Sequence, residues 1–171
     1  MSALLELSSA VRTCRSDMGL TQTTLARLSG LSRATVNQVE NGTIKDLSLT
    51  RAVRLLSVLG LSVTVSAPHA RNFQSTRARS CAFDLAARTA SVSFREPMSA
   101  SQLRDVFAFP DDAVPADFWP HLYTLLDEAP VSLLASMVEQ VHLELRMERT
   151  QAWKRMRSLA EQFKSSRDLW L

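Results

Sequence analysis

Four side chains between residues 33 and 38 have the types that read DNA bases. Arg33 can donate two hydrogen bonds to guanine, and the amide of Asn37 or Gln38 can pair with adenine. Ala34 can contact the methyl group of thymine. In a helix these positions, at i, i+1, i+4 and i+5, share one face. We therefore expect all four side chains to reach base edges together.

A second group of polar residues flanks this helix and suits the sugar–phosphate backbone. Gln22 opens the preceding helix, where a side-chain amide and free backbone N–H groups can bind phosphate. Such contacts would fix the register of the protein on DNA without reading its sequence. The expected phosphate-contacting residues are Thr21, Gln22, Ser32, Thr35, Asn41, Thr43 and Lys45.

Short helices must hold these two groups in place. Thr21 and Ser32 are the expected N-caps of the second and third helices, which a turn at residues 29–31 separates. Val36 and Val39 face inward and lock the third helix onto the core. The first helix is predicted from an apolar stripe of Leu4, Leu7, Val11, Cys14 and Met18. The fourth, which starts at Ser48, is predicted from an inward face of Leu49, Ala52, Val53, Leu56 and Leu59.

Residues 61–66 alternate apolar and polar side chains, which is typical of a strand with one buried face. A lone strand is not stable. It could pair with its own copy across a dimer axis, through Leu61, Val63 and Val65, or with a second short strand at residues 90–94. The first arrangement predicts a homodimer.

The rest of the chain divides into a linker and a second domain. Residues 67–97 are predicted to form a basic linker, and residues 98–171 a small helical domain. Trp170 could belong to its core or to a contact with a partner. The expected helices of this domain span residues 99–107, 115–126, 131–145 and 148–163.

Positive charge gathers in the first half of the chain. Residues 1–66 carry seven basic and four acidic side chains, residues 67–95 five and one, and residues 96–171 eight and twelve. A polyanionic partner would need this distribution. The basic linker could follow DNA or act only as a tether.

The sequence offers little for other chemistry. His69, His121 and His142 are far apart and have no neighbours at zinc spacing. No nucleophile motif or glycine-rich phosphate loop stands out, so we expect no metal, no cofactor and no enzyme activity. No apolar run of about 18 residues is present, and the first residues lack the basic region of a signal peptide. These features predict a cytoplasmic protein that does not enter a membrane.

Three runs of residues resemble the Xre/Cro family of phage and bacterial repressors. They are residues 19–26 (Gly-Leu-Thr-Gln-Thr-Thr-Leu-Ala), residues 29–36 (Ser-Gly-Leu-Ser-Arg-Ala-Thr-Val) and residues 40–42 (Glu-Asn-Gly). The resemblance implies that Arg15 and Glu40 form a structural ion pair. It also implies a mainly α fold, with a lambda-repressor-like helix-turn-helix domain at residues 1–66 that ends in the dimerisation strand, followed by the helical domain.

A narrower resemblance, to HipB-like antitoxins, rests on residues 41–49 and 59–65. It implies an autoregulating repressor that binds operator DNA as a homodimer and neutralises a toxin encoded beside it. Residues 98–171 would then bind the toxin. The alternative is a stand-alone Xre-type transcription factor whose second domain dimerises or senses an effector.

Overall fold

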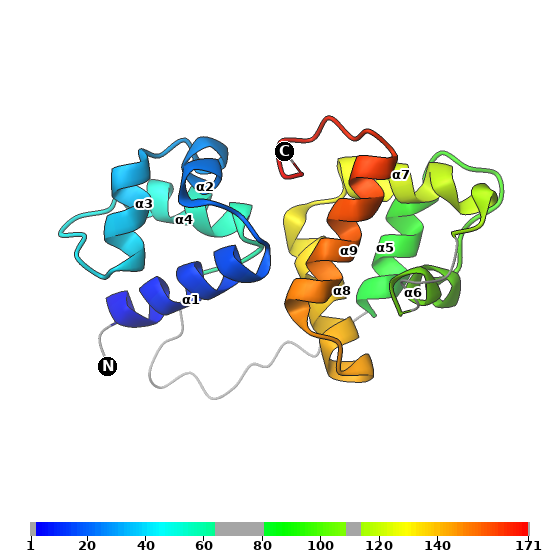
Figure 1. Ribbon diagram of the computed structural model, residues 1–171, viewed down its shortest axis with the longest axis horizontal. Helices are drawn as coiled ribbons and strands as arrows, with labels where there is room; N and C mark the ends of the chain where they lie inside the picture. Colours follow the sequence, from blue (N-terminus) through cyan, green and yellow to red (C-terminus); the bar gives the residue numbers. More distant parts are fainter. Residues whose placement is uncertain (1–2, 64–80, 109–113, 171) are drawn as a thin grey trace.

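The protein folds into two helical bundles connected in sequence by residues 64–80 (Figure 1). The computed structural model describes residues 3–63, 81–108 and 114–170. The N-terminal bundle comprises α1 (Ala3–Asp17), α2 (Gln22–Ser29), α3 (Arg33–Glu40) and α4 (Leu49–Val58). The C-terminal bundle comprises α5 (Ala82–Ala90), α6 (Ala100–Ala108), the short 3-10 helix η1 (Ala116–Phe118), α7 (Trp119–Glu128), α8 (Val131–Leu145) and α9 (Arg149–Gln162).

The starts of α2 and α3 are set by the two predicted N-caps. The Thr21 hydroxyl accepts a hydrogen bond from the backbone N–H of Thr24 at 3.0 Å, and the Ser32 hydroxyl accepts one from Thr35 at the same distance. Gly30 ends α2 in the left-handed region at φ +67°, which favours glycine. Both predicted caps are confirmed, and they place the two helices around a three-residue turn.

The fourth helix faces the core differently from the prediction. Leu55, Leu56 and Leu59 are buried, but Leu49 is 70% exposed and Val53 44% exposed. The face of α4 that packs into the core therefore includes Leu55 and excludes Leu49 and Val53. The stripe Leu49–Val53 has the same helical spacing as the buried one, so spacing could not decide which stripe faces the core.

The predicted strand at Leu61, Val63 and Val65 is wrong as far as the structure describes it. Residues 61–63 form no strand, and Val65 lies outside the described residues. Leu61 instead returns to the end of α4, where its backbone N–H donates to the carbonyl of Leu56. This closing turn follows Gly60, which sits at φ +72°.

Helix α5 occupies part of the predicted linker. It packs against α6, α7 and α8, and Phe83, Ala86 and Ala90 on it are fully buried. The predicted strand at residues 90–94 is also wrong, because Ala90 ends this helix and residues 91–93 form a turn. The small side chains of α5 favour a helix and allow close packing, so this part of the predicted linker packs with the C-terminal bundle.

The remaining helices of the second domain agree with their predictions within a few residues. Helix α8 has the predicted bounds, and α9 begins and ends one residue inside the predicted range. Trp170 belongs to the core of this domain. It lies 6.4 Å from Trp153, measured between ring centroids, and its indole N–H donates to the carbonyl of Leu126 at 3.1 Å.

The two bundles contact each other through the ends of α1 and α4 on one side and α8 and α9 on the other. Gly60 approaches α8 so closely that a Cβ atom there would lie 2.8 Å from the Cβ of Ala135. The Arg157 guanidinium donates to the carbonyl of Met18 at 2.7 Å. Within the described residues, no helix has the length and apolar character needed to cross a membrane.

Candidate nucleic-acid interface

The outer face of α3 presents Arg33, Ala34 and Gln38 to solvent. The opposite face is held by Val36 and Val39, which are fully buried. The helix lies on the side of the N-terminal bundle that is farthest from the C-terminal bundle (Figure 1). Arg33, Ala34 and Gln38 are thus exposed together on a helix that lies away from the described part of the second bundle.

Asn37 lies on the same helix but joins a different group. Its side-chain carbonyl accepts hydrogen bonds from Asn41 at 3.0 Å and from Gln22 at 3.4 Å. Gln22 and Asn41, both predicted to contact phosphate, therefore donate to the same acceptor, Asn37, which was predicted to read a base. Asn37 is exposed, but in this arrangement its carbonyl faces α2 and the end of α3.

Glu40 is the buried centre of this polar network. Arg15 donates to both of its carboxylate oxygens, at 2.5 Å from Nε and 3.2 Å from Nη2, and Gln22 donates to Oε2 at 2.9 Å. Burial would raise the pKa of Glu40, but the hydrogen bonds from Arg15 and Gln22 outweigh it and lower that pKa below its ordinary value. The charged carboxylate therefore ties α1, α2 and α3 together and fixes the Gln22 amide.

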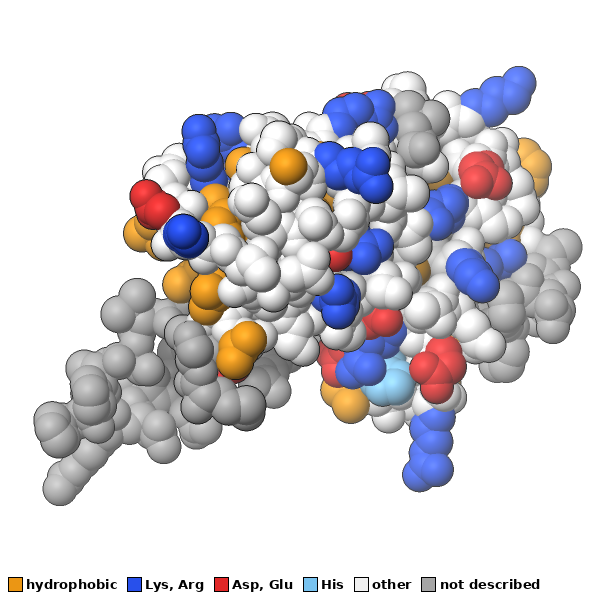
Figure 2. All heavy atoms as spheres, turned by 60° about the vertical axis from the view of Figure 1, so that its left-hand side comes forward, with side chains coloured by type: hydrophobic (Ala, Val, Ile, Leu, Met, Phe, Trp, Pro, Cys, Tyr) orange, Lys and Arg blue, Asp and Glu red, His pale blue; other side chains and the backbone are white. Residues whose placement is uncertain are grey.

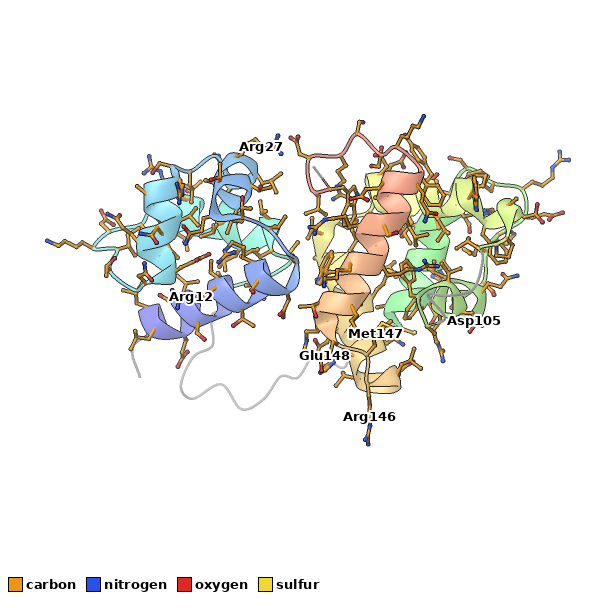
Figure 3. The ribbon with its side chains drawn as sticks, viewed as in Figure 1. Arg12, Arg27, Asp105, Arg146, Met147 and Glu148 are labelled. Carbon is orange, nitrogen blue, oxygen red and sulfur yellow. The ribbon has the colours of Figure 1, made fainter. Side chains whose placement is uncertain are left out.

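Arg12 is a member of the network that the sequence interpretation missed. Its guanidinium donates to the side-chain oxygen of Asn41 at 2.8 Å, and Figure 3 shows it projecting from α1 beside the end of α3. The sequence feature that could have indicated this role is its position three residues before Arg15, which places both arginines on neighbouring parts of one helix face. An exposed cation beside Asn41 adds a further group suited to phosphate.

The other predicted phosphate-contacting residues lie at helix starts and in the loop after α3. The capping hydroxyls also meet the hydroxyls of their partners, Thr21 with Thr24 at 2.9 Å and Ser32 with Thr35 at 2.8 Å. Thr43 and Lys45 are exposed in the loop between α3 and α4. Figure 2 turns this side of the molecule forward, and blue Lys and Arg side chains predominate over red Asp and Glu side chains on it.

Comparison with known families identifies the region. Residues 11–65 match the helix-turn-helix family model of the Xre and lambda-repressor type. The match covers α2, α3 and α4 and the second half of α1. This region is a helix-turn-helix domain. No curated protein and no solved structure matches the chain.

The helix-turn-helix domain indicates a DNA-binding transcriptional regulator and not an enzyme domain. In the family-matched segment, the turn between α2 and α3 is the one set by Gly30 and the Ser32 cap. The histidines do not gather with other metal-binding side chains: no group of three or more His, Cys, Asp or Glu residues suited to a metal ion occurs among the described residues, and His69 lies outside them.

Proposed function

We propose that the protein is a sequence-specific transcriptional repressor that inserts α3 into the major groove of operator DNA in the cytoplasm. One observation carries this proposal: Arg33, Ala34 and Gln38 are exposed on one face of a helix whose other face is fixed by fully buried valines. A rigid helix that presents these side-chain types can discriminate between base pairs by about 1–3 kcal/mol for each good bidentate contact.

The polar network around Glu40 supports the phosphate-contacting role of its neighbours. Gln22 and Asn41 are each held by at least two hydrogen bonds within the domain. Side chains that are already oriented lose less conformational freedom when they bind. In this proposal Arg12, Gln22 and Asn41 position the domain on the sugar–phosphate backbone, while Arg33 and Gln38 read bases.

We propose that the repressor acts as a homodimer, although residues 61–63 of the predicted interface strand form no strand. The exposed side chains Leu49 and Val53, one turn apart on α4, offer an apolar face for a second copy. A two-fold dimer would read a palindromic operator whose half-sites lie about one helical turn apart. Light scattering of the full chain should give twice the monomer mass, and a Leu49→Asp, Val53→Asp double variant should give the monomer mass.

We further propose that the second domain binds a protein partner, as an antitoxin binds its toxin. The supporting observation is an aromatic patch formed by Trp119, which is 50% exposed, Tyr123, which is 42% exposed, and Phe163. The Trp119 and Phe163 ring centroids are 5.8 Å apart. Trp and Tyr are enriched among the residues that dominate binding at interfaces. The acidic excess of residues 96–171 would suit a basic partner.

The protein encoded beside this one is the partner to test. If it is the toxin, it should bind the full chain in calorimetry, and Trp119→Ala should weaken that binding by about 2 kcal/mol or more. Leu143→Ala is a matched control, because Leu143 is an exposed apolar residue on α8 outside the patch. A neighbouring protein that does not bind would favour the stand-alone regulator.

Selection from a pool of random duplexes tests the DNA-binding proposal. The full chain should enrich one palindromic sequence, and Arg33→Ala should lose the preference at one position of each half-site. Arg88→Ala is the control, because this exposed arginine lies on α5 in the second domain. A pool that stays random after several rounds with the wild type would overturn the proposal.

A further inference from the structure

A cleft of about 410 Å³ lies where the helix-turn-helix domain meets the second domain. Its walls come from both: the end of α1 and the end of α4 on one side, and α8 with the start of α9 on the other. Clefts of this size that lie between domains are the usual place for small-molecule sites. The residues that matter to its chemistry are Cys14, Asp17, Leu59, Val138, Arg149 and Trp153.

Two close contacts bound the cleft and keep the domains at their present separation. At one boundary Gly60 lies against the backbone of α8, where a Cβ atom would come within 3.2 Å of the Val131 carbonyl oxygen. At the other, Arg157 bonds the Met18 carbonyl. Met18, Leu59 and Gly60 also line the cleft. The space is therefore framed by ordered contacts between the domains.

The charged groups of the cleft do not cancel. Glu139 and Arg149 neutralise each other in a two-point ion pair, with distances of 2.8 Å and 2.9 Å between donor nitrogens and carboxylate oxygens. The remaining carboxylate, Asp17, is half-buried and has no hydrogen bond or ion pair to any residue that the structure describes. Arg149 also lies near enough to Asp17 for that carboxylate to raise its pKa, so the charged side chains that line the cleft sum to one net negative charge.

The neighbouring thiol does not add to this charge. Burial and then the nearby Asp17 carboxylate raise the pKa of Cys14, so the thiol stays protonated at neutral pH. Cys14 and Asp17 lie three positions apart on α1, and both line the cleft.

We propose that this cleft binds a small organic cation, an amine carried on an aromatic or aliphatic body. Met18, Leu59, Leu61 and Val138 give it an apolar lining, which suits the body of such a molecule. Asp17 supplies the counter-charge for the ammonium group, and Trp153, which is buried apart from its contact with the cleft, adds to the apolar wall. Because its walls belong to both domains, a bound amine would contact the DNA-binding domain and the second domain at once.

Calorimetry tests this site on the full chain without DNA. It compares three indole compounds, one positively charged, one neutral and one negatively charged. Tryptamine carries the cation, tryptophol replaces the amine with a hydroxyl, and indole-3-propionate carries an anion. We expect tryptamine to bind about tenfold more tightly than tryptophol, because one close opposite charge stabilises it. Indole-3-propionate should bind more weakly than both.

Three variants separate the cleft from other surfaces. Asp17→Asn should bring the affinities for tryptamine and tryptophol together, because it removes the net negative charge of the cleft and keeps the size of the side chain. Thr13→Trp should abolish binding of all three compounds, because Thr13 is exposed at the edge of the cleft and an indole there would fill it. Ser158→Trp, at an exposed position of α9 outside the cleft, should leave binding unchanged.

Three results would overturn the proposal: no tryptamine binding at millimolar concentration, equal affinity for the three compounds, or tryptamine binding that Thr13→Trp leaves intact. Because no DNA is present, a failure here is distinct from a failure of the proposed operator binding.

Discussion

Two arginines of this protein, one in each half, are placed in opposite ways. In the helix-turn-helix domain, Arg33 is exposed on the outer face of α3 and Arg12 reaches the edge of the polar network. In the second domain, Arg167 is turned inward and donates to the backbone carbonyls of Leu126 and Ala129. The first domain thus leaves Arg33 open to a ligand, although it ties Arg15 to the buried Glu40, while the second domain uses Arg167 to close its own C-terminal turn.

The largest expected effect tests whether α5 belongs to the second domain. Phe83→Ala should destabilise that domain by about 3–5 kcal/mol, because Phe83 is fully buried and its removal leaves a cavity. All three tryptophans lie in the second domain, and Trp153 also borders the first, so their fluorescence during urea unfolding reports mainly on the second domain. Leu85→Ala, at an exposed position of the same helix, should cost much less. If the two variants lower the stability equally, α5 is not part of the core of the second domain.

The next effect concerns the first domain. Arg15→Ala should destabilise it by about 3 kcal/mol, because the change leaves the buried Glu40 carboxylate without its main partner. Thermal unfolding followed by circular dichroism measures this. Arg12→Ala removes a more exposed arginine from the same helix and should cost less than about 1 kcal/mol. If Arg15→Ala lowers the stability measured by tryptophan fluorescence and leaves the circular-dichroism melt unchanged, its effect does not lie in the first domain.

The effect of Arg15→Ala should also depend on pH. The pKa of Glu40 is lowered in the folded protein, so its ionised form stabilises the fold fully above its ordinary pKa of 4.5. This stabilisation is lost as the pH falls through the lowered value. The stability difference between the wild type and Arg15→Ala should therefore be constant near neutral pH and shrink below pH 4.5. A difference that grows on acidification would have the wrong sign.

The smallest expected effect concerns helix capping. Ser32→Ala should destabilise the first domain by about 1 kcal/mol, because the backbone N–H of Thr35 loses its acceptor. Ser32→Asn should retain most of the stability, since Asn is an equally good cap. Circular dichroism melts compare the three proteins. If the alanine and asparagine variants have the same melting temperature, loss of the cap does not cause the destabilisation.

The comparison also shows which parts of the structure could be predicted from sequence. The caps at Thr21 and Ser32 and the glycine turn between their helices are local signals, because each depends on residues within a few positions. Helices α8 and α9 were found within one residue because their apolar stripes are long. Such signals do not depend on the rest of the fold.

The errors arose where distant contacts decide the structure. Residues 90–94 alternate like a strand, but Ala90 is buried among helices of the second domain. Leu61 follows the same pattern, yet its backbone closes the turn after α4. In the candidate site, residue types indicated the exposed face of α3 but gave no sign that Asn37 is held by Gln22 and Asn41. That contact depends on how α2 and α3 cross.

The most direct test of the central claim is a gel-shift titration against the selected operator and a scrambled duplex, at two salt concentrations. The account predicts that Arg33→Ala and Gln38→Ala each lose about 10- to 100-fold in operator affinity. It also predicts that both variants bind the scrambled duplex as the wild type does and keep the wild-type salt dependence on it. If both variants bind the operator like the wild type, and only salt changes the affinity, then the domain binds DNA through charge alone and α3 does not read bases.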